Sequence, residues 1–148
     1  MLPSLIELQE RDTDADWREI GASEPYWGVL TNPRFRRAAM TGEELAEFYR
    51  TGQEHIDYIV SELRQLAGGD FAPKSAIDFG CGAGRLTEAM TAYCDTAIGV
   101  DVSPGMIEEA RRNGGGRARY ELEFPDAQVD WVNSYIVFQH IPPARGMA

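Results

Sequence analysis

The chain has 148 residues, with 24 acidic and 14 basic side chains and a formal net charge of −10. This length is sufficient for one domain with a substantial core. The acids are spread over both halves of the chain, so it lacks a basic surface for a phosphate backbone, and we expect no nucleic acid partner. The apolar runs are too short to span a bilayer, so we expect no membrane partner.

The N-terminal residues contain neither a basic segment nor a long apolar run, so we predict no secretion signal. The two cysteines, Cys81 and Cys94, have neither metal-ligand nor redox spacing. We interpret both as free thiols. The sequence therefore predicts a cytoplasmic protein without a metal site.

Residues 1–40 are predicted to form an N-terminal helical cap rich in large aromatic side chains. Three early aspartates can cap one short helix, and Asn32-Pro33 favours the start of another. The rings of this segment are Trp17, Tyr26, Trp27 and Phe35. They either close over a pocket as a lid, with Tyr26 and Trp27 facing a substrate, or bury one flank of the domain.

A second unit is predicted over residues 41–148, and it begins with a helix at 41–67. Thr41 and Glu44 have the spacing of a capping box. A one-sided apolar stripe follows and ends at Gly68-Gly69, so the helix is expected to pack on a sheet formed by residues 75–140. His55 lies beside the stripe without a metal-ligand partner and is interpreted as a surface or boundary residue.

A short buried strand is predicted at 75–79, and it ends in a glycine-rich loop. Gly80, Gly82 and Gly84 alternate with other residues, which allows positive φ angles and a close approach of a ligand to bare peptide groups. A helix is predicted from residue 83 to about 93, with its N-terminal N–H groups directed at that ligand. The alternative is an ordinary tight turn.

Strands and helices alternate through the rest of the chain. Further strands are predicted at 96–101, 118–122 and 129–138, and a helix capped by Ser103-Pro104 lies between the first two of them. This order predicts an α/β fold, a doubly wound and mostly parallel Rossmann-like sheet of about four strands. A ligand is expected over the carboxyl ends of the strands.

The glycine loop does not fit a dinucleotide site. Arg85 stands where the dinucleotide fingerprint has Gly or Ala, and Asp78 precedes the first glycine by two residues. Asp101, at the end of the second strand, can accept hydrogen bonds from both hydroxyls of a ribose, and this supports a nucleoside ligand of either type.

The stretch 78–85 resembles motif I of the class I S-adenosylmethionine-dependent methyltransferases. The stretches 99–106 and 129–141 are similar to the second motif and to the fourth-strand motif of the same family, in the same order. The resemblance implies a Rossmann-like fold, S-adenosylmethionine as the cofactor and methyl transfer to a small molecule. Residues 1–40 also look like the helical cap of bacterial members.

Carried over by position, the resemblance implies a role for each motif residue. It places Asp78, Gly80, Gly82, Gly84, Asp101, Val102, Met106, Asn133 and Ser134 at the cofactor. It directs Tyr135, Gln139 and His140 toward the substrate, and His140 is the candidate general base. Glu121, Glu123 and Asp126 are candidates for the acid that binds the adenine amino group.

Family members usually have seven strands, whereas this chain stops after the fourth predicted strand. The long apolar edge of that strand is expected to join copies of the chain into a homo-oligomer. A second interpretation is a non-catalytic S-adenosylmethionine-binding protein or an inactive methyltransferase fragment. A nicotinamide oxidoreductase is the third.

Overall fold

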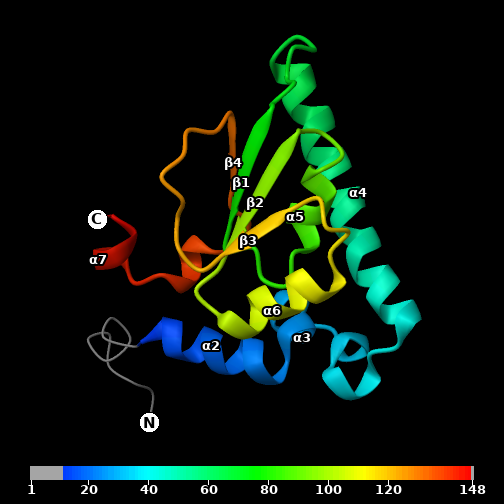
Figure 1. Ribbon diagram of the computed structural model, residues 1–148, viewed down its shortest axis with the longest axis vertical. Coiled ribbons are helices and arrows are strands. Elements are labelled where there is room, and N and C mark those ends of the chain that lie inside the picture. The colour runs from blue at the N-terminus through cyan, green and yellow to red at the C-terminus, as the bar shows by residue number, and fades with distance from the viewer. Residues whose placement is uncertain (1–11, 148) are drawn as a thin grey trace.

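The computed structural model describes residues 12–147 (Figure 1). The N-terminal part contains α2 (Thr13–Ser23), α3 (Pro25–Val29), two short 3-10 turns η1 (Pro33–Phe35) and η2 (Arg37–Ala39), and the long helix α4 (Gly42–Leu66). The alternating part contains β1 (Ser75–Phe79), α5 (Arg85–Met90), β2 (Thr96–Val100), α6 (Pro104–Asn113), β3 (Arg119–Glu121) and β4 (Trp131–Asn133). The 3-10 turn η3 (Phe138–His140) and the short helix α7 (Pro143–Gly146) follow.

The four strands form one parallel sheet in the order β3-β2-β1-β4. Ile77 of β1 lies opposite Ile98 of β2 on one side and Val132 of β4 on the other. Because all strands are parallel, their carboxyl ends meet at one end of the sheet, where α2, α3 and α6 also lie (Figure 1). The predicted α/β, Rossmann-like fold with N-terminal helices is confirmed.

Helix α4 begins at the predicted cap and covers one face of the sheet. The Thr41 hydroxyl oxygen accepts a hydrogen bond from the Glu43 N–H at 3.2 Å, and the hydroxyl donates to the Glu44 carboxylate. The buried stripe of α4 meets α5 and the inner side chains of three strands. This core contains Ile56, Val60, Ala76, Leu86, Ala89, Met90, Ala97 and Trp131.

The other face of the sheet presents Ile77, Ile98 and Val100, which form a small buried cluster with Val129 packed against it. Val129 belongs to the connection between β3 and β4, so this face is covered by a loop. Helices α4, α5 and α6 all pack on the opposite face. Val132, on the loop-covered face, remains 63% exposed.

The N-terminal helix α2 packs closely against α6 because glycines meet at the contact. A Cβ atom added to Gly21 would lie 2.0 Å from the Ser103 hydroxyl, and one added to Gly105 would lie 2.5 Å from the Gly21 carbonyl oxygen. Ser103 is also the N-cap of α6, with its hydroxyl oxygen accepting from the Met106 N–H. This contact fixes α2 beside the carboxyl ends of the strands.

Two predicted elements are shorter in the structure. The strand expected at 129–138 is reduced to β4, because its neighbour β1 ends one residue after the last pair, Asp78 with Asn133. Within residues 12–147 the segment beyond Asn133 has no ladder partner, and it turns away with Ile136 at a φ of 57°. The prediction of a long apolar edge on strand four is therefore wrong.

The first crossover helix, expected from 83 to 93, is limited to α5. Gly84 adopts a left-handed conformation with a φ of 85°, so the helix cannot extend back through it to Ala83. Residues 91–93 form turns. Both changes leave the central strands as predicted, with β1 at the expected bounds.

Packing between α4 and α5 depends on Gly52. A Cβ atom at this position would lie 2.1 Å from the Arg85 carbonyl oxygen, which is backbone. We expect Gly52→Ala to lower the free energy of unfolding by about 1–3 kcal/mol, because the two helices must separate. Gly42→Ala, in the first turn of the same helix, is the control, because its Cβ would meet nothing within 4 Å.

Chemical unfolding followed by circular dichroism measures both variants. The Gly42→Ala protein should unfold at the same denaturant concentration as the wild type or slightly above it. Equal stability of the two variants would contradict the close packing of α4 on α5.

Candidate cofactor-binding site

The loop between β1 and α5 is fixed to the end of β2 by its own backbone. The N–H groups of Gly80 and Cys81 both donate to the Val100 carbonyl oxygen, at 2.8 and 3.0 Å. Gly80 and Gly82 have φ angles of 74° and 54°, which side chains rarely tolerate. Every second residue here is a glycine because the chain reverses direction within a few residues and needs positive φ angles to do so.

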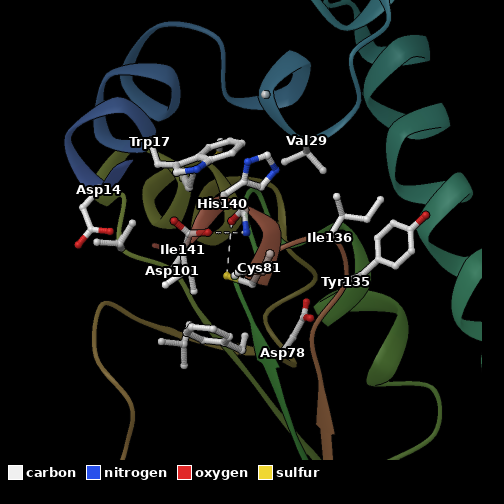
Figure 2. A pocket seen from close by; sticks show the side chains of 18 of the residues that line it. Asp14, Trp17, Val29, Asp78, Cys81, Asp101, Tyr135, Ile136, His140 and Ile141 are labelled. Atoms are coloured by element: carbon white, nitrogen blue, oxygen red, sulfur yellow. Dashed lines mark hydrogen bonds between the residues drawn. The ribbon is translucent and has the colours of Figure 1, made fainter. Parts of the chain in front are cut away.

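A cavity of about 440 Å³ opens beside this loop. Its size lies within the range of about 300–1,000 Å³ that is typical of small-molecule sites. Figure 2 shows Asp78 and Asp101 on one side, Trp17 and His140 facing them, and Tyr135 toward α4. The cavity lies at the carboxyl ends of β1 and β2, as predicted from the strand order.

Asp78 is buried at the base of the cavity and held by two side chains. One carboxylate oxygen accepts from the Asn133 amide at 2.8 Å, and the other accepts from the Thr87 hydroxyl at 2.7 Å. Burial raises the pKa of Asp78 to about 6, although these two hydrogen bonds act in the opposite direction. The sheet register places Asn133 beside Asp78 and so explains this contact.

Asp101 connects the glycine loop to the start of α6. One carboxylate oxygen accepts from the Gly82 N–H and the other from the Ser103 N–H, each at 2.9 Å. Each carboxylate oxygen has a second lone pair, so the group can still accept hydrogen bonds from a ligand. Burial raises its pKa, and the nearby Asp14 contributes in the same direction.

The charges on the cavity wall are predominantly acidic. Four carboxylates, Asp14, Asp78, Asp101 and Glu123, line it together with two arginines, Arg85 and Arg145. Arg145 is paired with Asp14 at 3.0 Å, so the rest of the wall has three carboxylates, Asp78, Asp101 and Glu123, to one arginine, Arg85. Such a wall favours a cationic ligand such as a sulfonium or an ammonium group.

The structure brings most of the predicted cofactor residues to one cavity. Its lining includes Asp78, Gly80, Gly82, Asp101, Val102 and Met106, together with Tyr135 and His140 from the predicted substrate set. Three predicted cofactor residues do not line it. Gly84 packs under Tyr120, Asn133 supports Asp78, and the Ser134 hydroxyl is buried with no hydrogen-bond partner within residues 12–147.

Three of the predicted substrate or lid residues lie outside the lining. Tyr26 is buried in the core, where its hydroxyl donates to Glu109 at 2.8 Å and its ring packs edge-on against Phe48. Trp27 stacks on the Arg36 guanidinium at 3.7 Å. Gln139 is exposed and contacts the His140 ring. For Tyr26, the structure therefore has the arrangement in which the ring buries a flank of the domain.

Several lining residues were not identified from the sequence as site residues. The sequence places Trp17 in the aromatic cluster, and Arg85 at the end of the motif I stretch and as an exception to the dinucleotide fingerprint, without a site role for either. Among the candidate acids after strand three, Glu123 lines the cavity, whereas Glu121 and Asp126 do not. The sequence feature that could identify Arg85 as a site residue is its position immediately after the last glycine, at the start of α5.

Two contacts close the cavity between α2 and the C-terminal segment. The Asp14–Arg145 ion pair joins α2 to α7. The Trp17 and His140 rings meet edge-on with their centres 5.0 Å apart. Two valines pack directly against the glycine loop. The Val137 side chain lies where a Cβ of Gly80 would be, and the Val29 side chain lies where a Cβ of Gly82 would be.

Residues 77–148 match the protein family described as "Methyltransferase domain". This part of the chain contains a methyltransferase domain, which agrees with the predicted resemblance to the class I S-adenosylmethionine-dependent methyltransferases. Within residues 12–147, no helix has the length and apolar character needed to cross a bilayer.

Two curated relatives illustrate the range of proteins that share this domain. Ribosomal protein L11 methyltransferase from an Enterobacter species is 37% identical over 92 residues, which is 58% of this chain and 31% of that protein. Trans-aconitate 2-methyltransferase from Methylobacterium nodulans is 39% identical over 77 residues, which is 48% of this chain and 30% of that protein. The chain spans about a third of the length of these relatives.

Among solved structures, the magnesium protoporphyrin IX methyltransferase of Synechocystis with bound SAH has a similar fold. The TM-score is 0.61 at 20% identity, and the match covers 92% of this chain and 65% of that chain. The shared fold includes the N-terminal helices as well as the sheet, since nearly the whole chain is covered.

The residues around the cavity fit the family's cofactor. S-adenosylmethionine carries a positive sulfonium and an ammonium group, which the acidic wall can accommodate. Gly80 and Gly82 of the tethered loop line the cavity, and Val102 and Met106 provide apolar surfaces for a flat base.

Burial of Asp78 predicts a specific pH dependence of stability. Its pKa is 3.8 in the unfolded chain and about 6 in the folded protein, so folding takes up a proton within this window. The contribution is present below about pH 4 and is lost as the pH rises through 6, by up to about 3 kcal/mol. Asp78→Asn should remove this dependence.

Unfolding free energies of the wild type and Asp78→Asn, measured from about pH 4 to pH 7, check this. The wild type should lose stability relative to the variant as the pH rises. Asp95→Asn, the same charge change at an exposed turn, is the control. A difference between wild type and Asp78→Asn that stays constant over this range would contradict the assignment.

Proposed function

We propose that this protein transfers a methyl group from S-adenosylmethionine to a small-molecule acceptor. The observation that carries the proposal is one cavity that combines the tethered glycine loop with the carboxylates of Asp78 and Asp101. The family match of residues 77–148 supports methyl transfer but not a particular class of acceptor.

In the proposed arrangement each part of the cofactor has its own contacts. The ribose hydroxyls donate to Asp101, and the adenine lies between Val102 and Met106. Glu123 accepts from the adenine amino group, because it lines the same cavity and is the one acid among the three candidates that does so. Gly80 and Gly82 approach the methionine part, whose ammonium group faces Asp78.

The sulfonium supplies an already activated methyl group, so the protein has to align the acceptor and exclude water. Tyr135, Ile136 and His140 form the wall on which we place the acceptor. His140 is the candidate base for an acceptor that must lose a proton, and its contact with the Trp17 ring fixes its position.

The shape of the site, and not the relatives, supports a small-molecule acceptor. One relative is named for a ribosomal protein and another for trans-aconitate, so the family includes both kinds of acceptor. The cavity is closed by the Asp14–Arg145 pair and the Trp17–His140 contact, which favours a small molecule.

A second candidate is a protein that binds S-adenosylmethionine without transferring its methyl group. The exposed Val132 and the loop-covered face of the sheet favour this alternative, because helices cover that face in a complete Rossmann-like fold. Methyl transfer from labelled cofactor to a library of small acceptors distinguishes the two.

Calorimetric titration tests the cofactor assignment. S-adenosylmethionine and S-adenosylhomocysteine should bind, and NAD should not. We expect Asp101→Asn to weaken binding by about 1.5–3 kcal/mol, because a hydrogen bond to a charged acceptor is lost. Glu108→Gln, an exposed change on α6, is the control.

Binding of NAD with an affinity equal to that of S-adenosylmethionine would contradict the proposal. His140→Gln belongs to the same series, because a residue that acts on the acceptor should leave cofactor affinity unchanged. A large loss of cofactor affinity in this variant would assign His140 to the cofactor instead.

We also propose self-association, now through the exposed face beside β4. Val132, Phe124 and Phe138 are all exposed near this edge, although the strand itself has only three residues. Light scattering at micromolar concentration should show a dimer or a larger assembly. A monodisperse monomer would contradict this. The cytoplasmic location expected from the free thiols also remains a prediction.

A further inference from the structure

Arg85 is a buried cation in the wall of the cavity. Only 5% of the residue is exposed, yet it carries a guanidinium with five N–H donors. A buried charge is costly unless it is paired and hydrogen-bonded, because it has lost its hydration. The partners of the guanidinium therefore show whether its hydrogen bonds are satisfied without a ligand.

The partners of Arg85 are few, and none of them is a carboxylate. One terminal nitrogen lies 3.4 Å from the Thr51 hydroxyl, and the other lies 3.4 Å from Nδ1 of His55. The Nε atom is buried with no hydrogen-bond partner among residues 12–147. Burial and the positive charge of Arg85 both lower the pKa of His55, which favours the neutral imidazole beside the guanidinium.

Asp78 is the carboxylate that acts on Arg85 through space, but it does not neutralise the guanidinium by direct contact. Both of its oxygens are directed at Asn133 and Thr87. Within the described part of the chain, no ion pair joins Arg85 to an acid. The guanidinium thus has donors available at the cavity wall, and a planar carboxylate is their best geometric match.

We propose that Arg85, positioned by Thr51 and His55, binds the carboxylate of the methionine part of S-adenosylmethionine. The inference rests on the proposed function. An α-amino acid group needs an anion for its ammonium and a cation for its carboxylate. Asp78 and Arg85 supply this pair at the two ends of the glycine loop, on the same cavity.

The opposite charges also explain why Arg85 is tolerated in the interior. Without ligand the guanidinium is only partly satisfied, and a bound carboxylate completes its hydrogen bonds. Arg85 follows Gly84 directly, so the same loop that approaches the cofactor also orients the arginine. Tyr135 lies against His55 with ring centres 4.3 Å apart, which closes this pocket from the β4 side.

A comparison of two ligands tests the inference without an acceptor. S-adenosylhomocysteine carries the amino acid group, whereas methylthioadenosine retains the adenosine and the thioether but has neither ammonium nor carboxylate. We expect Arg85→Met to weaken S-adenosylhomocysteine binding by about tenfold to 100-fold and to leave methylthioadenosine binding unchanged. Isothermal calorimetry measures both affinities.

Two further variants make the result specific. Arg85→Lys keeps the charge but loses the planar pair of donors, so it should retain part of the affinity for S-adenosylhomocysteine. It also replaces Arg85→Met in the comparison if that variant does not fold. Arg50→Met removes an exposed arginine of α4 that pairs with Glu47 and is the matched control. It should bind both ligands as the wild type does.

The outcomes separate this inference from the proposed function. If the wild type binds neither ligand, the proposed function fails. If the wild type binds both and Arg85→Met weakens both equally or neither, the cofactor assignment of Arg85 is overturned while the proposed function stands. Selective loss of S-adenosylhomocysteine supports the inference.

Discussion

The site depends on the attachment of the glycine loop to the end of β2. Two N–H groups of the loop share the Val100 carbonyl oxygen, and a third donates to Asp101. These bonds satisfy buried donors and hold a backbone with positive φ angles in one shape. Because Asp101 also caps the approach to α6, the first βα loop and the second are fixed relative to each other.

The central part of the fold could be predicted because its local signals agree. Ile77 and Phe79 mark a buried strand, the glycines mark a reversal, and Ser103-Pro104 marks a helix start. The structure has β1, β2 and α6 at nearly the predicted positions. Strand four could not be bounded from its composition, because its length is set by where its partner β1 ends, which is a property of the sheet.

The candidate site could be predicted only where a local motif identifies its residues. Asp78 and Asp101 have fixed offsets from the glycines, so a motif identifies them. Trp17 and Glu123 reach the cavity through the packing of α2 and the path of the β3–β4 connection, which no local pattern encodes. Tyr26 has the composition expected of a lid, but its hydroxyl partner Glu109 is 83 positions away in the chain.

The segments that close the cavity contribute few buried residues to the core. Helix α7 buries none of its residues, and α2 buries only Gly21. One partly exposed ion pair and one ring contact join them across the cavity. Because α2 is held against α6 at Gly21, we expect exchange of a bound molecule with solvent to need only opening of the C-terminal segment around α7, while the parallel strands and α4 stay in place. The residence time of a ligand and the global stability of the protein are thus set by different parts of the chain.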